Sequence, residues 1–126
     1  MAVLKKANGV TYPAGEALAA ADVGRGGVFN TSGQIVAAGA GVYPHVIIRD
    51  IQATIGNGVP CLDVPTSVEV SVTLAGTVTQ GQELVTDANG DFVAGTSGDK
   101  FCLIAMVAGA TGETIGAKVV PADTVA

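Results

Sequence analysis

The residues best suited to chemistry in this sequence form one short polar run. Asp87, Asn89 and Asp91 alternate within DANGD, as the oxygen ligands of a calcium-binding loop do. An EF-hand loop starting at Asp87 would need glycine at position 92 and glutamate at position 98, where this chain has Phe92 and Gly98. The run therefore predicts a turn, and we expect no metal site.

The other candidates for catalysis lack the partners that catalysis requires. His45, in VYPHVIIRD, is the single histidine, and no G-x-S-x-G or Cys–His signature accompanies it. Cys61 and Cys102 lack C-x-x-C spacing and lie in apolar surroundings, which indicates buried free thiols. The glycine-rich VGRGGV at 23–28 lacks the lysine of a phosphate-binding loop. We expect no catalytic residue and no cofactor, and hence a protein that is not an enzyme.

Composition points to a thin all-β body. The chain has 126 residues with 18 glycines, 48% hydrophobic residues, 4% aromatic residues and no tryptophan, so few side chains can fill a deep core. Such a chain suits a thin sandwich or a small barrel with many tight turns. The net charge of −5 argues against a nucleic-acid binder, which needs a basic stripe. We therefore expect no nucleic-acid partner.

No segment indicates a membrane span or a secretory signal. The longest apolar run, residues 101–110, is about half the length of a membrane-spanning helix. It predicts a buried strand instead. The residues after Lys5 and Lys6 do not form an apolar signal region. We expect no membrane partner and a chain that is made in a cytoplasm.

The rest of the chain reads as short strands punctuated by turns. SVEVSV at 67–72 alternates apolar and polar residues, as a strand with one wet face does. GEALAAAD at 15–22 is the only stretch rich in helix formers and predicts at most one short helix. Pro60 and Pro65 bracket residues 61–64, which indicates an edge strand or a loop. Further strands are expected at 27–29, 34–37, 42–48, 83–86, 91–94, 101–108 and 114–120.

One short pattern occurs twice. VFNTSGQIVA at 28–37 aligns with VTDANGDFVA at 85–94, at a spacing of 57 positions (85 minus 28). Each copy places Asn or Asp at the start of a turn and glycine at its end, which predicts a β-hairpin with a left-handed glycine. The predicted turn residues are Asn30, Gly33, Asp87, Asn89 and Gly90. Pseudo-symmetry and independent use of a common hairpin both account for the repetition.

The first fifteen residues differ in charge from the rest. Lys5 and Lys6 stand there without any acid, whereas residues 16–126 carry all 11 acids and four of the six basic residues. We expect an extended N-terminal arm at 1–15, which this asymmetry indicates, and a single barrel-like domain at 16–126. Chain starts are often basic and mobile, so the asymmetry also has a reading without function.

Residues 76–120 carry two rhythms of glycine and apolar residues. The first rhythm comprises Gly81, Leu84, Asp87, Gly90 and Phe92, and the second Ile104, Ala105, Ala108, Gly109, Gly112, Ile115 and Val119. In these rhythms, rather than in any site chemistry, the C-terminal part resembles the small decoration (cement) proteins of bacteriophage capsids. The chain departs from that family at Leu103 and Ile104, where Gly-Val is more usual, and in residues 109–113, which read as an insertion.

This resemblance implies a β-barrel or β-tulip body that binds the outside of an assembled phage head. Such proteins commonly form homotrimers and bridge neighbouring subunits of the major capsid protein, often through an arm. The expected localisation is the exterior of the virion, with the major capsid protein as partner. The capsid-interface candidates in the arm are Val3, Leu4, Lys5, Lys6, Val10 and Tyr12.

Other functions remain open at this point. Another virion protein, such as a head fibre or a tail component, fits the same composition. A small ligand-binding module is a further alternative, although a sugar site normally uses exposed aromatic residues, of which the chain has few. Residues 76–90 also share the rhythm of biotinyl- and lipoyl-carrier hairpins, but their turn lacks the lysine that carries the cofactor.

Overall fold

The computed structural model describes residues 8–18, 22–49 and 58–126, and it is all-β. One 3-10 helix, η2 (Val64–Thr66), separates two sets of five strands. The predicted all-β class is confirmed. The strands are β1 (Asn8–Pro13), β2 (Gly26–Phe29), β3 (Ile35–Ala37), β4 (Val46–Ile48), β5 (Gly58–Asp63), β6 (Glu69–Thr73), β7 (Glu83–Thr86), β8 (Phe92–Ala94), β9 (Lys100–Ala105) and β10 (Thr114–Thr124).

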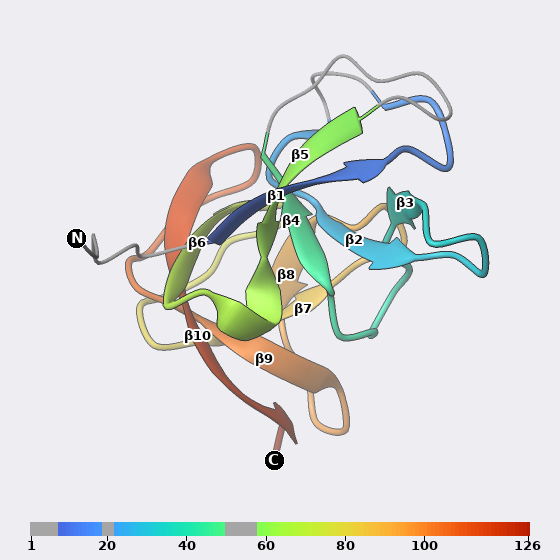
Figure 1. Cartoon of the computed structure of the whole chain (residues 1–126). Coiled ribbons are helices and arrows are strands. Elements are labelled where there is room, and N and C mark those ends of the chain that lie inside the picture. The colour runs from blue at the N-terminus through green and yellow to red at the C-terminus, as the bar shows by residue number, and fades with distance from the viewer. Residues whose placement is uncertain (1–7, 19–21, 50–57) are drawn as a thin grey trace.

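The strands form two sheets with one topology. The first sheet has the order β1-β5-β4-β2-β3 and the second the order β6-β10-β9-β7-β8, which is the same arrangement five strands later. We call residues 8–63 the first repeat and residues 69–124 the second repeat (Figure 1, blue to green and green to red). Within the described ranges, neither sheet closes into a barrel, so the expected barrel is replaced by two open sheets.

The two repeats also share their register. Ile48 pairs with Cys61 in the first repeat, and Ala105 pairs with Ala117 at the corresponding places in the second. The parallel bridge from Ala14 to Ile35 likewise corresponds to the bridge from Leu74 to Phe92. Pseudo-symmetry therefore explains the repeated hairpin, which belongs to a duplicated five-stranded unit.

The repeats share their hydrophobic interior. The first repeat buries a small cluster of its own, and the second repeat buries a larger one that also takes in Ile47 of β4 and Val64 of η2. Packing across the repeats thus contributes to the stability of both. The first cluster contains Ala14, Leu18, Ile35, Val46, Ile48 and Cys61.

Some elements differ from their expected form. β5 lies between β1 and β4 rather than at an edge, although it contains Pro60. This proline is tolerated inside the sheet because β4 ends at Ile48 and Pro60 lies beyond that end. Its carbonyl still accepts a hydrogen bond from the amide of Arg49. The segment expected to be helical shows a bend and a bridge over residues 15–18, and residues 19–21 lie outside the described part. The strand expected at 42–48 is confined to β4.

Candidate interaction surfaces

The contact between the repeats is made by different faces of the two units. The β7–β8 hairpin of the second repeat lies on the first repeat, where the amide of Gly26 donates to the carbonyl of Gly90 at 2.8 Å. The amide of Gly41 donates to the carbonyl of Thr86 at 2.9 Å, and the Thr86 hydroxyl donates to the carbonyl of Gly39 at 2.7 Å. We call the first-repeat residues Gly26, Ala38, Gly39, Gly41 and Val42 the receiving face.

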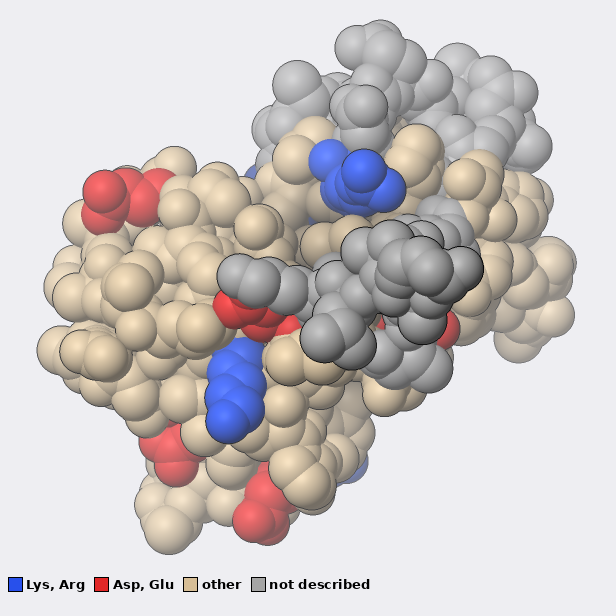
Figure 2. All heavy atoms as spheres, turned by 60° about the vertical axis from the view of Figure 1, so that its left-hand side comes forward, with Lys and Arg blue, Asp and Glu red and all other residues tan. Residues whose placement is uncertain are grey.

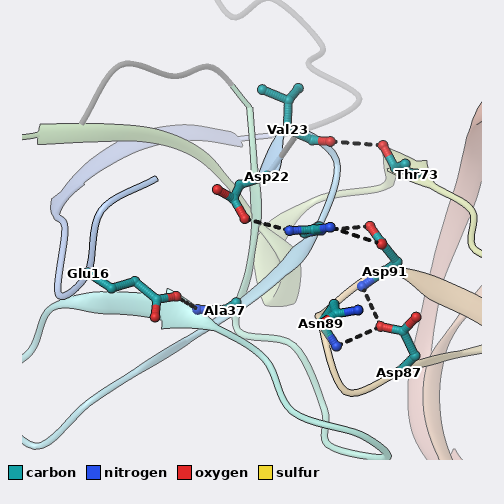
Figure 3. Close-up of polar contacts among 9 residues, drawn as sticks. Glu16, Asp22, Val23, Ala37, Thr73, Asp87, Asn89 and Asp91 are labelled. Atoms are coloured by element: carbon teal, nitrogen blue, oxygen red, sulfur yellow. Dashed lines mark hydrogen bonds and ion pairs between the residues drawn. The ribbon is translucent and has the colours of Figure 1, made fainter. Parts of the chain in front are cut away.

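An ion pair crosses the same contact. Arg25, next to the receiving face, donates from Nε to Asp91 Oδ1 at 2.9 Å and from Nη1 to Asp22 Oδ1 at 2.7 Å (Figure 3). Hydrogen bonding to Asp91 raises the pKa of Arg25 above its usual value. Both side chains of the Arg25–Asp91 pair are largely buried, at 22% and 14% exposure, so the pair fixes how the repeats meet.

The polar run that suggested calcium chemistry has a structural role. Asp87 Oδ1 accepts the amides of Asn89 at 2.9 Å and Asp91 at 3.0 Å, which holds the turn that presents Gly90 (Figure 3). Asn30 Oδ1 does the same for Ser32 and Gln34 in the first repeat. Gly33 and Gly90 have φ angles of 75° and 85°. Among the described residues, no group of three potential metal ligands forms a site.

Three aromatic rings gather on the outside of the first repeat. The Phe29 ring lies edge-on to Tyr12 at a centroid distance of 4.7 Å and stacked on His45 at 5.5 Å. His45 Nδ1 accepts the amide of Phe29 at 3.1 Å, which fixes the histidine ring. Phe29 is 36% exposed and His45 is exposed. We call Tyr12, Phe29 and His45 the aromatic face.

A mainly apolar cleft of about 570 Å³ opens where the repeats join. Tyr43 stands at this cleft, donates its hydroxyl to the carbonyl of Asp123 at 3.2 Å, and lies 5.9 Å beneath Lys100 Nζ. The bulge between β9 and β10 contributes another wall. The lining comprises Tyr43, Pro44, His45, Val64, Pro65, Ser67, Cys102, Val119, Val120, Pro121 and Ala122.

Both cysteine thiols are buried. Cys61 is fully buried in the first cluster, and burial raises the pKa of its thiol to about 12. Cys102 is 8% exposed beside the cleft, and burial raises its pKa to about 11. Burial disfavours the reactive thiolate form at both positions.

The charges on the described surface are scattered. On the face in Figure 2, a few basic and acidic side chains lie among uncharged residues, and one basic side chain adjoins an acidic group. Within residues 8–18, 22–49 and 58–126, no helix has the length and apolar character to cross a membrane.

The predicted interface residues fall in two places. Val3, Leu4, Lys5 and Lys6 lie outside the described residues. Val10 and Tyr12 belong to β1, which pairs with β5 along six positions. The structure thus brings Tyr12 together with Phe29 and His45, two residues that the sequence did not single out as interface candidates. The signal that could have found Phe29 is the alignment of the repeats, where Phe29 stands opposite Thr86.

No protein-family model and no curated protein matches the sequence. The fold is similar to that of a solved structure, the N base of head fibre gp8.5 from bacteriophage phi29, with a TM-score of 0.74 and 13% sequence identity over 94% of this chain and 98% of that chain. At that identity the likeness establishes the fold alone.

Proposed function

We propose that this chain is a structural protein on the outside of a phage head. The observation that carries the proposal is the likeness to the base of a phage head fibre, because it spans almost the whole of both chains. The glycine rhythm shared with capsid decoration proteins supports the same location independently. The role needs binding and rigidity, and it requires no catalysis or cofactor.

Two forms of this role fit the chain. As a decoration protein it would bridge subunits of the major capsid protein and stabilise the assembled lattice by mass action, because it binds only that state. As the base of a head fibre it would anchor a projection without strengthening the shell. Decoration is the form that the sequence rhythm favours, and a fibre base is the form that the fold comparison favours.

The N-terminal segment is the proposed grip on the capsid. Val3, Leu4 and Tyr12 supply apolar contacts, and Lys5 and Lys6 supply charges that can pair with capsid acids. Since residues 8–13 form β1, a deletion that tests the grip should remove residues 1–7 only and leave the sheet intact.

The direct test is binding to purified heads that lack this chain. The intact protein should sediment with the heads, and the 1–7 deletion should sediment less, with an unchanged melting temperature. The double change Lys5→Glu with Lys6→Glu separates charge from length. Heads that fail to bind the intact protein would overturn the proposal.

A second measurement on the same heads separates the two forms. A decoration protein should raise the temperature at which the heads release their DNA, whereas a fibre base should leave it unchanged. The family resemblance implies three copies of this chain per binding position on the head. Such binding would show as a threefold molar ratio of this chain to binding positions in the bound complex.

The alternative of a ligand-binding module has one structural observation in its favour, the cleft lined by Tyr43 and apolar residues. Screening a glycan panel with the intact chain tests it. Binding that Tyr43→Ala abolishes would support this module.

A further inference from the structure

The contact between the repeats is heterologous, and such a contact leaves two unused faces. The second repeat contributes Thr86 and Gly90, and the first contributes the receiving face. Each repeat contains both kinds of position. The first repeat therefore still presents its own equivalent of the Thr86 face, and the second still has its own equivalent of the receiving face.

The unused face of the first repeat is the aromatic face. Phe29 corresponds to Thr86 and His45 to Cys102, each at a spacing of 57 positions (86 minus 29, and 102 minus 45). In the second repeat Thr86 and Cys102 are only 2% and 8% exposed, because this face lies against the first repeat. In the first repeat the same positions hold an exposed phenylalanine and an exposed histidine. Exposed aromatic side chains thus stand in the first repeat where the second repeat makes its contact.

The unused face of the second repeat is contacted by Val125, which follows β10, and we call residues 124–126 the tail. The amide of Gly98, which corresponds to Gly41, donates to the carbonyl of Val125 at 2.9 Å. The amide of Val125 donates to the carbonyl of Asp99 at 2.8 Å, as the Thr86 hydroxyl donates to Val42 at 3.3 Å in the first repeat. Val125 therefore occupies the place on the second repeat that Thr86 occupies on the first.

Side-chain packing agrees with the backbone. Gly95 corresponds to Ala38, and a Cβ added there would lie 2.8 Å from a methyl carbon of Val125. In the first repeat the corresponding neighbour of Ala38 is Gly90 of the second repeat, where an added Cβ would lie 3.3 Å from the backbone of Ala38. Val125 is partly buried, whereas residues 121–124 and 126 are exposed. Val125 thus adds one side chain and two backbone hydrogen bonds to the strand pairing of Thr124 with Lys100 in β9.

We propose that the tail covers a face that binds a second copy of this chain, and that Phe29 of that copy takes the place of Val125. The contact would repeat the backbone arrangement of the internal one. At the positions of Arg25 and Asp91 it has Gln82 and Gln34, so two neutral amides replace the internal ion pair, and Glu83 and Asp99 stand at the positions of Gly26 and Val42. Tail and partner exclude each other, because both would use the amide of Gly98. This inference does not depend on the proposed role in a virion.

The test uses two variants. Deleting residues 124–126 removes Val125 and exposes the second repeat's equivalent of the receiving face, which we call the receiving position. Phe29→Asp puts a charge on the aromatic face. The deletion variant should have a higher mass than the intact chain at equal concentration in sedimentation velocity. Adding Phe29→Asp to the deletion should return the mass to that of the intact chain. Deleting Ala126 alone, which leaves Val125 in place, is the matched control.

Mixing the variants tests the direction of the contact. The double variant offers only the receiving position, and the single deletion offers both faces, so the double variant should cap the deletion variant and reduce its mass in proportion to the amount added. Val125→Asp keeps the chain length and should reproduce the association if the deletion lowers the melting temperature. An unchanged mass in both tail variants would overturn the proposal, and so would association that Phe29→Asp does not affect.

Discussion

Gly33 and Gly90 hold the same place in the two hairpins but have different surroundings. Both have positive φ angles, of 75° and 85°, which a β-branched residue resists. A Cβ at Gly33 would meet nothing within 4 Å, whereas a Cβ at Gly90 would lie 2.9 Å from the carbonyl oxygen of Gly26 in the other repeat. The two glycines therefore separate backbone strain from a clash between repeats.

The first prediction compares valine at these two positions. Gly33→Val should lower the free energy of unfolding by about 1 to 3 kcal/mol through strain alone. Gly90→Val should lower it by a further ~1 to 3 kcal/mol, because the repeats must move apart. Denaturant unfolding of both variants gives the comparison. Equal losses would show that the β7–β8 turn does not lie against β2.

The second prediction concerns the thiols. Raised pKa values of about 12 for Cys61 and about 11 for Cys102 leave almost no thiolate at pH 8. Native protein should react with a thiol reagent much more slowly than unfolded protein, and Cys102 should react before the fully buried Cys61. Mass spectrometry of the timed reaction identifies the modified residue. Fast modification of Cys61 in folded protein would contradict its burial.

The same groups make stability depend on alkaline pH. A thiol whose folded pKa exceeds its unfolded value of 9.0 favours the folded state below pH 9, and this contribution is lost as pH rises toward the folded value. Between pH 9 and 11 the intact protein should therefore lose more stability than Cys61→Ala does, each measured relative to its own stability at pH 8. Parallel curves for the two proteins would show that Cys61 has no part in this loss.

At the scale of elements, the ion pair between Arg25, just before β2, and Asp91, just before β8, orders the two repeats. Arg25→Gln should lower the free energy of unfolding by about 1 to 2 kcal/mol, since Asp91 would lose its charged partner in a largely buried place. The double change Arg25→Gln with Asp91→Asn should recover part of the loss, because it removes the unmatched charge. A double variant as unstable as the sum of both single variants would contradict this coupling.

The sequence predicted the hairpins but left the duplication of the whole unit as one of two explanations. The hairpins lie 57 positions apart, but the strand bridges at Ala14 and Leu74 are 60 apart (74 minus 14), because the repeats differ in loop length. Equivalent core positions also hold side chains of different size, such as Cys61 in the first repeat and Ala117 in the second. The repeats share burial and strand register, and neither property requires identical residues at equivalent positions.

The position of β5 was mispredicted for a related reason. Pro60 predicts an edge strand when only its missing backbone N–H group is considered. Whether that amide is needed depends on where the neighbouring strand stops, and β4 stops at Ile48. The length of β4 follows from tertiary packing, which no local pattern reveals.

At the scale of the molecule, the candidate surfaces depend on how the repeats are joined. Tyr12 was an interface candidate by sequence, but Phe29 and His45 become visible as a face only when the second repeat shows the same positions buried. Their exposure is a property of the assembled pair of repeats. The cleft at the junction arises in the same way, from residues that lie far apart along the chain.

The most direct test of the central claim is quantitative mass spectrometry of purified virus particles from the source of this chain. The proposal predicts that the chain is present in a fixed ratio to the major capsid protein, at many copies per particle, and that the copies are accessible to proteases on intact heads. Particles that lack the chain, or that hold it only inside the shell, would contradict a structural role on the head exterior.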